Sequence, residues 1–146
     1  MFCASNPALP AGQIATTLLA GATPQAREQA CYAFWQALPA KRLALPSQVF
    51  FIIEGFASGS SPLAEISGAS VQIQRLAPAC LCCSGNMVLN VHLNRLIRQV
   101  QKSRQQSDVQ LVISLADAEH LTSLRAKLTA PPFQQYLQLL PDCLLT

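Results

Sequence analysis

The stretch IATTLLAGATPQAREQACYAFWQAL, residues 14–38, decides the fold because a strand-like run, a glycine turn and a helical pattern follow one another in it. Residues 14–20 combine Ile, Thr, Leu and Ala without a charge, which is typical of a strand covered on both faces. Thr23 is a favoured N-cap and Pro24 a favoured first helical residue, so we expect a helix that ends before Pro39. The stretch therefore predicts a strand-turn-helix unit of an α/β protein.

Strands and helices continue to alternate along the rest of the chain. Apolar or alternating runs predict strands, and a stripe of apolar residues at helical period predicts the longest helix. The predicted strands cover residues 49–53, 70–76 and 109–115, and the predicted helices cover residues 88–104 and 118–128. This alternation favours an α/β fold of three layers, in which helices flank a mostly parallel sheet.

Composition and charge narrow the class of protein. The 146 residues fit one domain over residues 1–146, and 51% hydrophobic with only 12% charged residues exclude a disordered chain. The net charge of +3 comes from scattered Lys and Arg, so we expect no nucleic-acid partner. No apolar run approaches the roughly 18 residues of a membrane-spanning helix, so we expect no membrane partner. Three of the six cysteines cluster, which suits a reducing cytoplasm better than a disulfide framework.

The cysteine cluster is the strongest chemical signal. Cys80, Cys82 and Cys83 directly precede the turn residues 84–86. Soft thiolates this close together bind metal ions or carry out redox chemistry. Zn²⁺ takes sulfur ligands at about 2.3 Å in a tetrahedron, so three cysteines leave one position for water or another ligand. Burial of the thiols as small apolar side chains and redox pairing remain open as alternatives.

The turn after the first strand has the context of a phosphate-binding loop, whose pattern is Gly, four residues, then Gly-Lys-Ser/Thr. Only Gly21 fits, because Ala26, Arg27 and Glu28 stand where the second Gly, the Lys and the hydroxyl are needed. Ala26 adds a Cβ where backbone must approach phosphate, and Glu28 brings negative charge where a hydroxyl should hold Mg²⁺. Gly21 and Arg27 are the two residues that a degenerate phosphate-binding loop would retain for binding a cofactor. We otherwise expect Arg27 to lie exposed on its helix, and we do not expect GTP to bind.

Three segments together resemble the CobW-like metallochaperone GTPases, a family of the P-loop GTPase class. Residues 76–86, LAPACLCCSGN, look like the family's Cys-x-Cys-Cys segment, and a helix with the pattern LNRLIR follows. Residues 49–56, VFFIIEGF, are similar to the family's second strand and its Asn-Glu-Phe-Gly motif. Residues 115–117, LAD, look like the end of its Glu-x-x-Gly-Leu-Ala-Asp-Pro stretch. The resemblance runs from the first strand nearly to the C-terminus, in the family's order.

This resemblance implies a metal site. It implies that Cys80, Cys82 and Cys83 bind Zn²⁺ or another transition metal, and that Glu54 could add an oxygen ligand. It also implies a P-loop-NTPase-like fold, here truncated, because the chain ends at Thr146 before a guanine-specifying motif. The partners that it implies are the metal ion, and a client metalloprotein or a complete CobW-like homologue.

The sequence therefore predicts a cytoplasmic, metal-binding pseudo-GTPase that neither binds nor hydrolyses GTP, which favours a protein that is not an enzyme. Two alternatives stay open. One is an active GTPase of metal homeostasis, or one whose nucleotide site a partner completes. The other is a non-catalytic interaction module that regulates a complete homologue.

Overall fold

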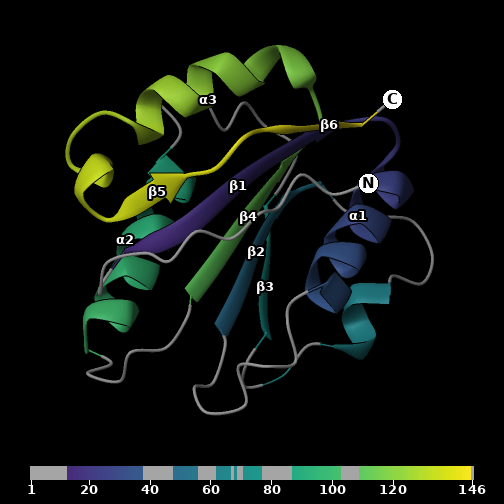
Figure 1. Ribbon diagram of the computed structural model, residues 1–146, viewed down its shortest axis with the longest axis horizontal. Helices are drawn as coiled ribbons and strands as arrows, with labels where there is room; N and C mark the ends of the chain where they lie inside the picture. Colours follow the sequence, from purple (N-terminus) through teal and green to yellow (C-terminus); the bar gives the residue numbers. More distant parts are fainter. Residues whose placement is uncertain are drawn as a thin grey trace.

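Strands and helices alternate in the computed structural model, which describes residues 13–37, 48–55, 62–66, 68, 71–76, 87–102 and 109–145 (Figure 1). The strands are β1 (Ile14–Gly21), β2 (Gln48–Glu54), β3 (Val71–Leu76), β4 (Val109–Leu115), β5 (Leu137–Leu139) and β6 (Cys143–Leu145). The helices are α1 (Pro24–Ala37), α2 (Met87–Lys102) and α3 (Leu121–Leu128), with short 3-10 helices η2 (Pro62–Glu65), η3 (Ala118–His120) and η4 (Phe133–Gln135). The described chain is thus α/β, as its periodicity predicts.

The described strands pair in parallel throughout, in the order β3-β2-β4-β1-β5. β5 pairs with residues 14–16 at the start of β1, and β6 pairs with residues 19–21 at its end. Parallel neighbours need crossover connections, and the helices lie in these connections. The prediction of a mostly parallel sheet flanked by helices is confirmed.

Helices cover both faces of the sheet, which makes three layers (Figure 1). On one face, α2 and α3 pack against Leu18, Ile52 and Ile113. On the other face, Phe34 of α1 packs with Phe51 and with η2. Neighbouring residues of β2 point to opposite faces, so Phe51 and Ile52 belong to different cores. A strand in this position has to be apolar along its whole length.

The apolar stripe predicted for residues 88–104 forms α2. Its buried residues recur at helical period and are Leu89, Leu93, Leu96, Ile97 and Val100. The remaining positions are mostly polar. No helix within the described ranges is long and apolar enough to cross a membrane.

The C-terminal part differs from the sequence prediction in two places. β5 and β6 have three residues each, too few to show a period, and they were not predicted. The helix expected over residues 118–128 begins as η3, because the Asp117 side chain accepts a hydrogen bond from the N–H of Glu119 at 2.9 Å. The α-helix itself begins only at Leu121.

The carboxyl ends of the strands meet at one edge of the sheet because the strands run the same way. Glu54 at the end of β2 is the register partner of Leu76 at the end of β3. The N–H of Gly55 donates to the carbonyl of Leu76 at 2.7 Å and extends this pairing by one residue. β1 ends at Gly21 on the same edge. The edge therefore collects the glycine turn, Glu54 and the strand end that precedes the cysteines.

Candidate functional site

The turn after β1 is closed by the C-terminal strand. Gly21 has φ +101° and Ala22 has φ +55°, both in the region that favours glycine. β6 pairs directly with Gly21, and a Cβ at this position would overlap the carbonyl oxygen of Leu145. The close approach of β6 therefore requires a glycine at position 21. This requirement does not depend on a bound phosphate.

Arg27 folds back over this turn from the first turn of α1. Its Nη1 donates to the carbonyl oxygens of Gly21 at 3.1 Å and of Ala22 at 3.0 Å. Arg27 is only 5% exposed, so the expectation that it lies exposed on its helix is wrong. The physical reason is that the two carbonyls of the tight turn need donors, and a guanidinium offers several in one plane. A phosphate cradle needs the opposite arrangement, with backbone N–H groups directed into an open site.

Acidic groups surround the Arg27 guanidinium. Burial lowers the pKa of Arg27, while Glu54, Cys31 and Glu28 act in the opposite direction. Glu54 is 6% exposed, and its Oε1 accepts a hydrogen bond from the N–H of Ala116 in the loop after β4 at 2.9 Å. The buried cation and the buried carboxylates thus offset one another's desolvation.

A second ion pair joins α1 to β3. Nη2 of Arg75 lies 2.7 Å from Oε1 of Glu28, whose side chain is 3% exposed against 25% for Arg75. Sequence reasoning missed this pair, although one signal was present. Arg75 shares its side of β3 with Val71 and Ile73, and a charged group on an apolar side needs a partner. The partner, Glu28, lies 47 residues earlier in the sequence, and only the fold shows that the two side chains meet.

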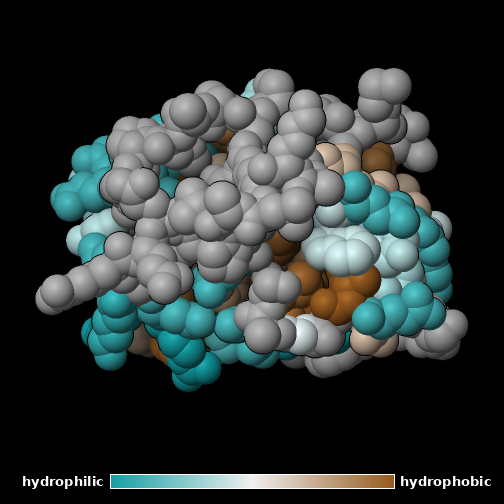
Figure 2. Space-filling view, turned by 60° about the horizontal axis from the view of Figure 1, so that its bottom comes forward, coloured by the Kyte–Doolittle hydropathy of each residue, from teal (hydrophilic) through white to brown (hydrophobic). Residues whose placement is uncertain are grey.

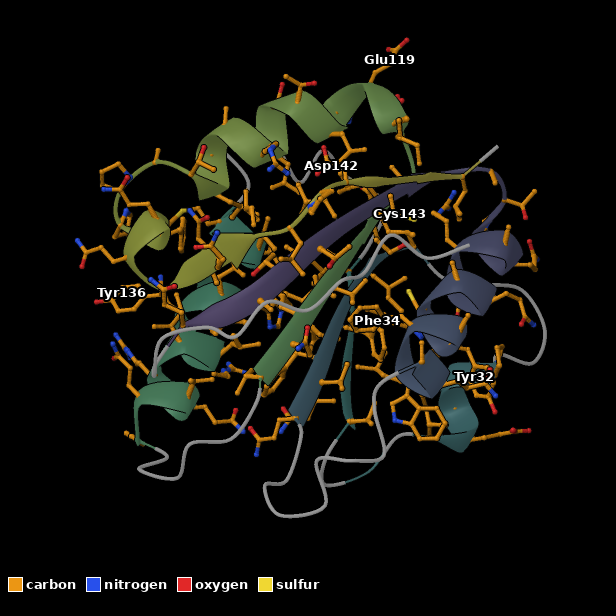
Figure 3. The ribbon with its side chains drawn as sticks, in the orientation of Figure 1. Tyr32, Phe34, Glu119, Tyr136, Asp142 and Cys143 are labelled. Atoms are coloured by element: carbon orange, nitrogen blue, oxygen red, sulfur yellow. The ribbon has the colours of Figure 1, made fainter. Side chains whose placement is uncertain are left out.

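The predicted ligands Cys80, Cys82 and Cys83 lie outside the described residues. In the part of the chain that the structure describes, no group of three His, Cys, Asp or Glu side chains could hold a metal ion. Cys31 and Cys143 belong to the core on the α1 face of the sheet, and Figure 3 shows Cys143 there. Burial raises the pKa of Cys31 to about 12, so its thiol stays protonated at neutral pH and is a poor ligand.

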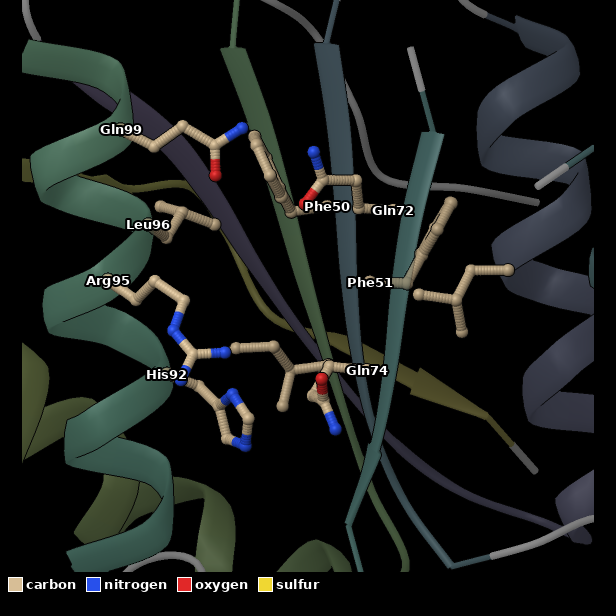
Figure 4. Close-up of a pocket in the computed structure, with 10 residues that line it drawn as sticks. Phe50, Phe51, Gln72, Gln74, His92, Arg95, Leu96 and Gln99 are labelled. Carbon is tan, nitrogen blue, oxygen red and sulfur yellow. The ribbon is translucent and has the colours of Figure 1, made fainter. Parts of the chain in front are cut away.

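A small hollow lies between α2 and the strands β2 and β3. Figure 4 shows His92 and Arg95 side by side on α2, facing Gln74. Burial, and then the charge of Arg95, lower the pKa of His92, so its imidazole is neutral at physiological pH. The hollow measures about 110 Å³, below the roughly 300–1,000 Å³ of ordinary small-molecule sites. It is too small to be the main candidate site.

The carboxyl edge therefore combines two chemical features. At the glycine turn, Arg27 donates to the carbonyls of Gly21 and Ala22, and β6 pairs with Gly21. Glu54 offers a carboxylate beside the strand end from which the chain continues toward the cysteines. Comparisons with protein-family models, with curated proteins and with solved structures found no match.

Proposed function

We propose that the protein binds a transition-metal ion, with Zn²⁺ as the expected ion, through Cys80, Cys82 and Cys83. We also propose that these cysteines belong to a GTPase-like domain that does not bind GTP. The ligand assignment rests on the sequence. The observation that carries the proposal is the register pairing of Glu54 with Leu76, because Leu76 is the last described residue before the cysteines.

Glu54 suits the fourth position of such a site. Its Oε1 is already oriented by the N–H of Ala116, and carboxylates that bind metals are commonly held in this way by a further hydrogen bond. Three thiolates and one oxygen complete the tetrahedron that Zn²⁺ prefers. A fourth ligand that is a carboxylate rather than a thiolate favours transfer of the ion to another protein over a permanent structural role.

The nucleotide half of the proposal is supported by the closed turn. For the backbone to reach a phosphate, Arg27 would have to leave the carbonyls of Gly21 and Ala22. β6 would also have to separate from Gly21. The first change would take the buried Arg27 guanidinium from two of its acceptors, and the second would break strand pairing, at about 1–3 kcal/mol for each buried group that loses its partner.

Equilibrium dialysis against Zn²⁺, followed by elemental analysis, tests the metal site. We expect about one ion per native chain and none in the variant Cys80→Ser/Cys82→Ser/Cys83→Ser. The matched control is Cys31→Ala/Cys143→Ala, which removes two buried thiols and should retain the ion. Equal metal content in the native chain and the triple variant would overturn the proposal.

Titration with fluorescent GTP in the presence of Mg²⁺ tests the nucleotide half separately. We expect no saturable binding to the native chain. A micromolar dissociation constant would instead favour the alternative of a GTPase of metal homeostasis.

A further inference from the structure

The first turns of α2 expose large apolar side chains. Met87 is 70% exposed, Val88 54% and Val91 51%. Their spacing of three and four residues places Val91 beside both of the others on one side of the helix. The buried stripe of α2 that packs on the sheet consists of other residues, so these three lie outside that stripe. Apolar side chains gathered at one exposed place mark an interaction surface.

Basic residues continue this exposed side toward the end of α2. Arg95, Arg98 and Lys102 follow Val91 at helical spacing, and α2 contains no Asp or Glu. None of the three forms an ion pair with the part of the chain that the structure describes. All three line a hollow of about 550 Å³ together with Val91 and two amide side chains. Figure 2 shows hydrophilic side chains gathered at the lower left, where α2 lies.

We propose that this α2 surface, made of Met87, Val88, Val91, Arg95, Arg98 and Lys102, docks an acidic segment of a partner protein that also presents apolar side chains. The charges argue for an acidic partner because three cations stand together without a carboxylate on their helix. The apolar end supplies the area whose removal from water stabilises the complex. The inference goes beyond metal binding and does not depend on it.

Other occupants fit the α2 surface less well. A second copy of the chain docked through the same helix would bring cations against cations, which is unfavourable. A helix that lies on a membrane buries an apolar stripe along its full length, and the full-length stripe of α2 is already in the core. A nucleic-acid backbone binds cations but has no need for exposed Met and Val.

Binding of a defined peptide tests the inference. The probe is a fluorescein-labelled synthetic peptide in which leucine and glutamate recur at helical spacing, titrated with the full chain and followed by fluorescence anisotropy. We expect saturable binding that weakens as salt is raised. Val91→Ser and the pair Arg95→Gln/Arg98→Gln should each weaken binding at least about tenfold.

Two controls test whether binding is specific to the α2 surface. They distinguish it from nonspecific hydrophobic contact and from an effect of charge alone. Leu144→Ser replaces another exposed apolar residue, 62% exposed and on β6 rather than on α2, and should leave binding unchanged (Figure 1). Arg95→Lys/Arg98→Lys keeps the charge and should retain most of the affinity. All the substituted positions are exposed, and circular dichroism verifies that each variant is folded.

Three results would overturn the inference. The first is the absence of saturable peptide binding, and the second is binding that the α2 variants leave unchanged. The third is tighter binding to phosphatidylserine vesicles or to duplex DNA than to the peptide, which would assign the surface to a membrane or a nucleic acid.

Discussion

Arg27 and Gly21 are joined by a hydrogen bond of 3.1 Å from Nη1 of the arginine to the carbonyl oxygen of the glycine. The same nitrogen reaches the carbonyl of Ala22 at 3.0 Å. Gly21 and Ala22 both have positive φ angles, and the arginine that donates to their carbonyls is almost completely buried. The contact therefore stabilises the turn by giving both of its carbonyls a donor.

Replacing Arg27 should destabilise the fold. In Arg27→Met, two part-buried carbonyls lose their donor and the buried Glu54 loses a neighbouring cation, so we expect the free energy of unfolding to fall by about 2–4 kcal/mol. Urea denaturation measures this change. The control Arg98→Met alters an exposed arginine and should change stability by less than about 0.5 kcal/mol. Equal effects of the two substitutions would contradict the role given to Arg27.

Replacing Gly21 should detach β6. In Gly21→Ala, the added Cβ meets the carbonyl of Leu145, and alanine at φ +101° adds backbone strain. We expect a loss of more than about 2 kcal/mol in the free energy of unfolding, with faster hydrogen exchange in β6. Gly68→Ala is the matched control, because a Cβ there meets nothing within 4 Å. A stable Gly21→Ala variant with protected β6 amides would be inconsistent with this packing.

The longer helices and strands could be predicted because the apolar residues in each recur with a helical or strand period. Thr23 accepts a hydrogen bond from the N–H of Ala26 at 3.1 Å, as expected of the N-cap before Pro24. β4 covers the predicted residues 109–115 without change. β6 could not be predicted in this way, because its three residues are defined by their pairing with the end of β1. Because β1 and β6 are far apart in the sequence, their pairing leaves no recognisable pattern within the residues of β6.

The ion pair between Glu28 and Arg75 should contribute measurably to stability. The single variants Glu28→Gln and Arg75→Gln each leave one charge without its partner, and we expect each to lower the free energy of unfolding by about 1–3 kcal/mol. The double variant should lose less than the sum of the two. A coupling energy near zero in this double-mutant cycle would show that the 2.7 Å contact does not contribute.

The buried thiol of Cys31 predicts a loss of stability at alkaline pH. Burial raises its pKa from 9.0 to about 12, so between these values the thiol ionises in the unfolded chain but not in the folded one. Stability from this residue is complete below pH 9.0 and is lost as the pH rises through that window. The decline is at most about 1.4 kcal/mol per pH unit.

Urea denaturation at about pH 8 and about pH 10 checks this prediction, with Cys31→Ala as the reference for all other titrating groups. The native chain should lose more stability over this interval than the variant. Parallel pH dependence in the two proteins would mean that Cys31 ionises as easily in the folded state as in the unfolded one.

The candidate site could be predicted only in part. The expectation of a poor phosphate loop stays a prediction from the residue types at Ala26 and Glu28, each of which has a local chemical consequence. The burial of Arg27 could not be read in this way, because it depends on how the carbonyls of the turn point and on β6 closing the turn from the other end of the chain. The metal site remains a prediction from the spacing of Cys80, Cys82 and Cys83.

Titration of the metal-free chain with Co²⁺ tests the central claim most directly, because thiolate-to-cobalt charge transfer gives absorption in the near ultraviolet that grows with the number of bound thiolates. We predict that the native chain develops this absorption to saturation at about one ion per chain, and that Zn²⁺ then abolishes it. The variant Cys80→Ser/Cys82→Ser/Cys83→Ser should show none, while Cys31→Ala/Cys143→Ala behaves like the native chain. Absence of charge-transfer absorption in the native chain, or equal absorption in the triple variant, would contradict the proposed site.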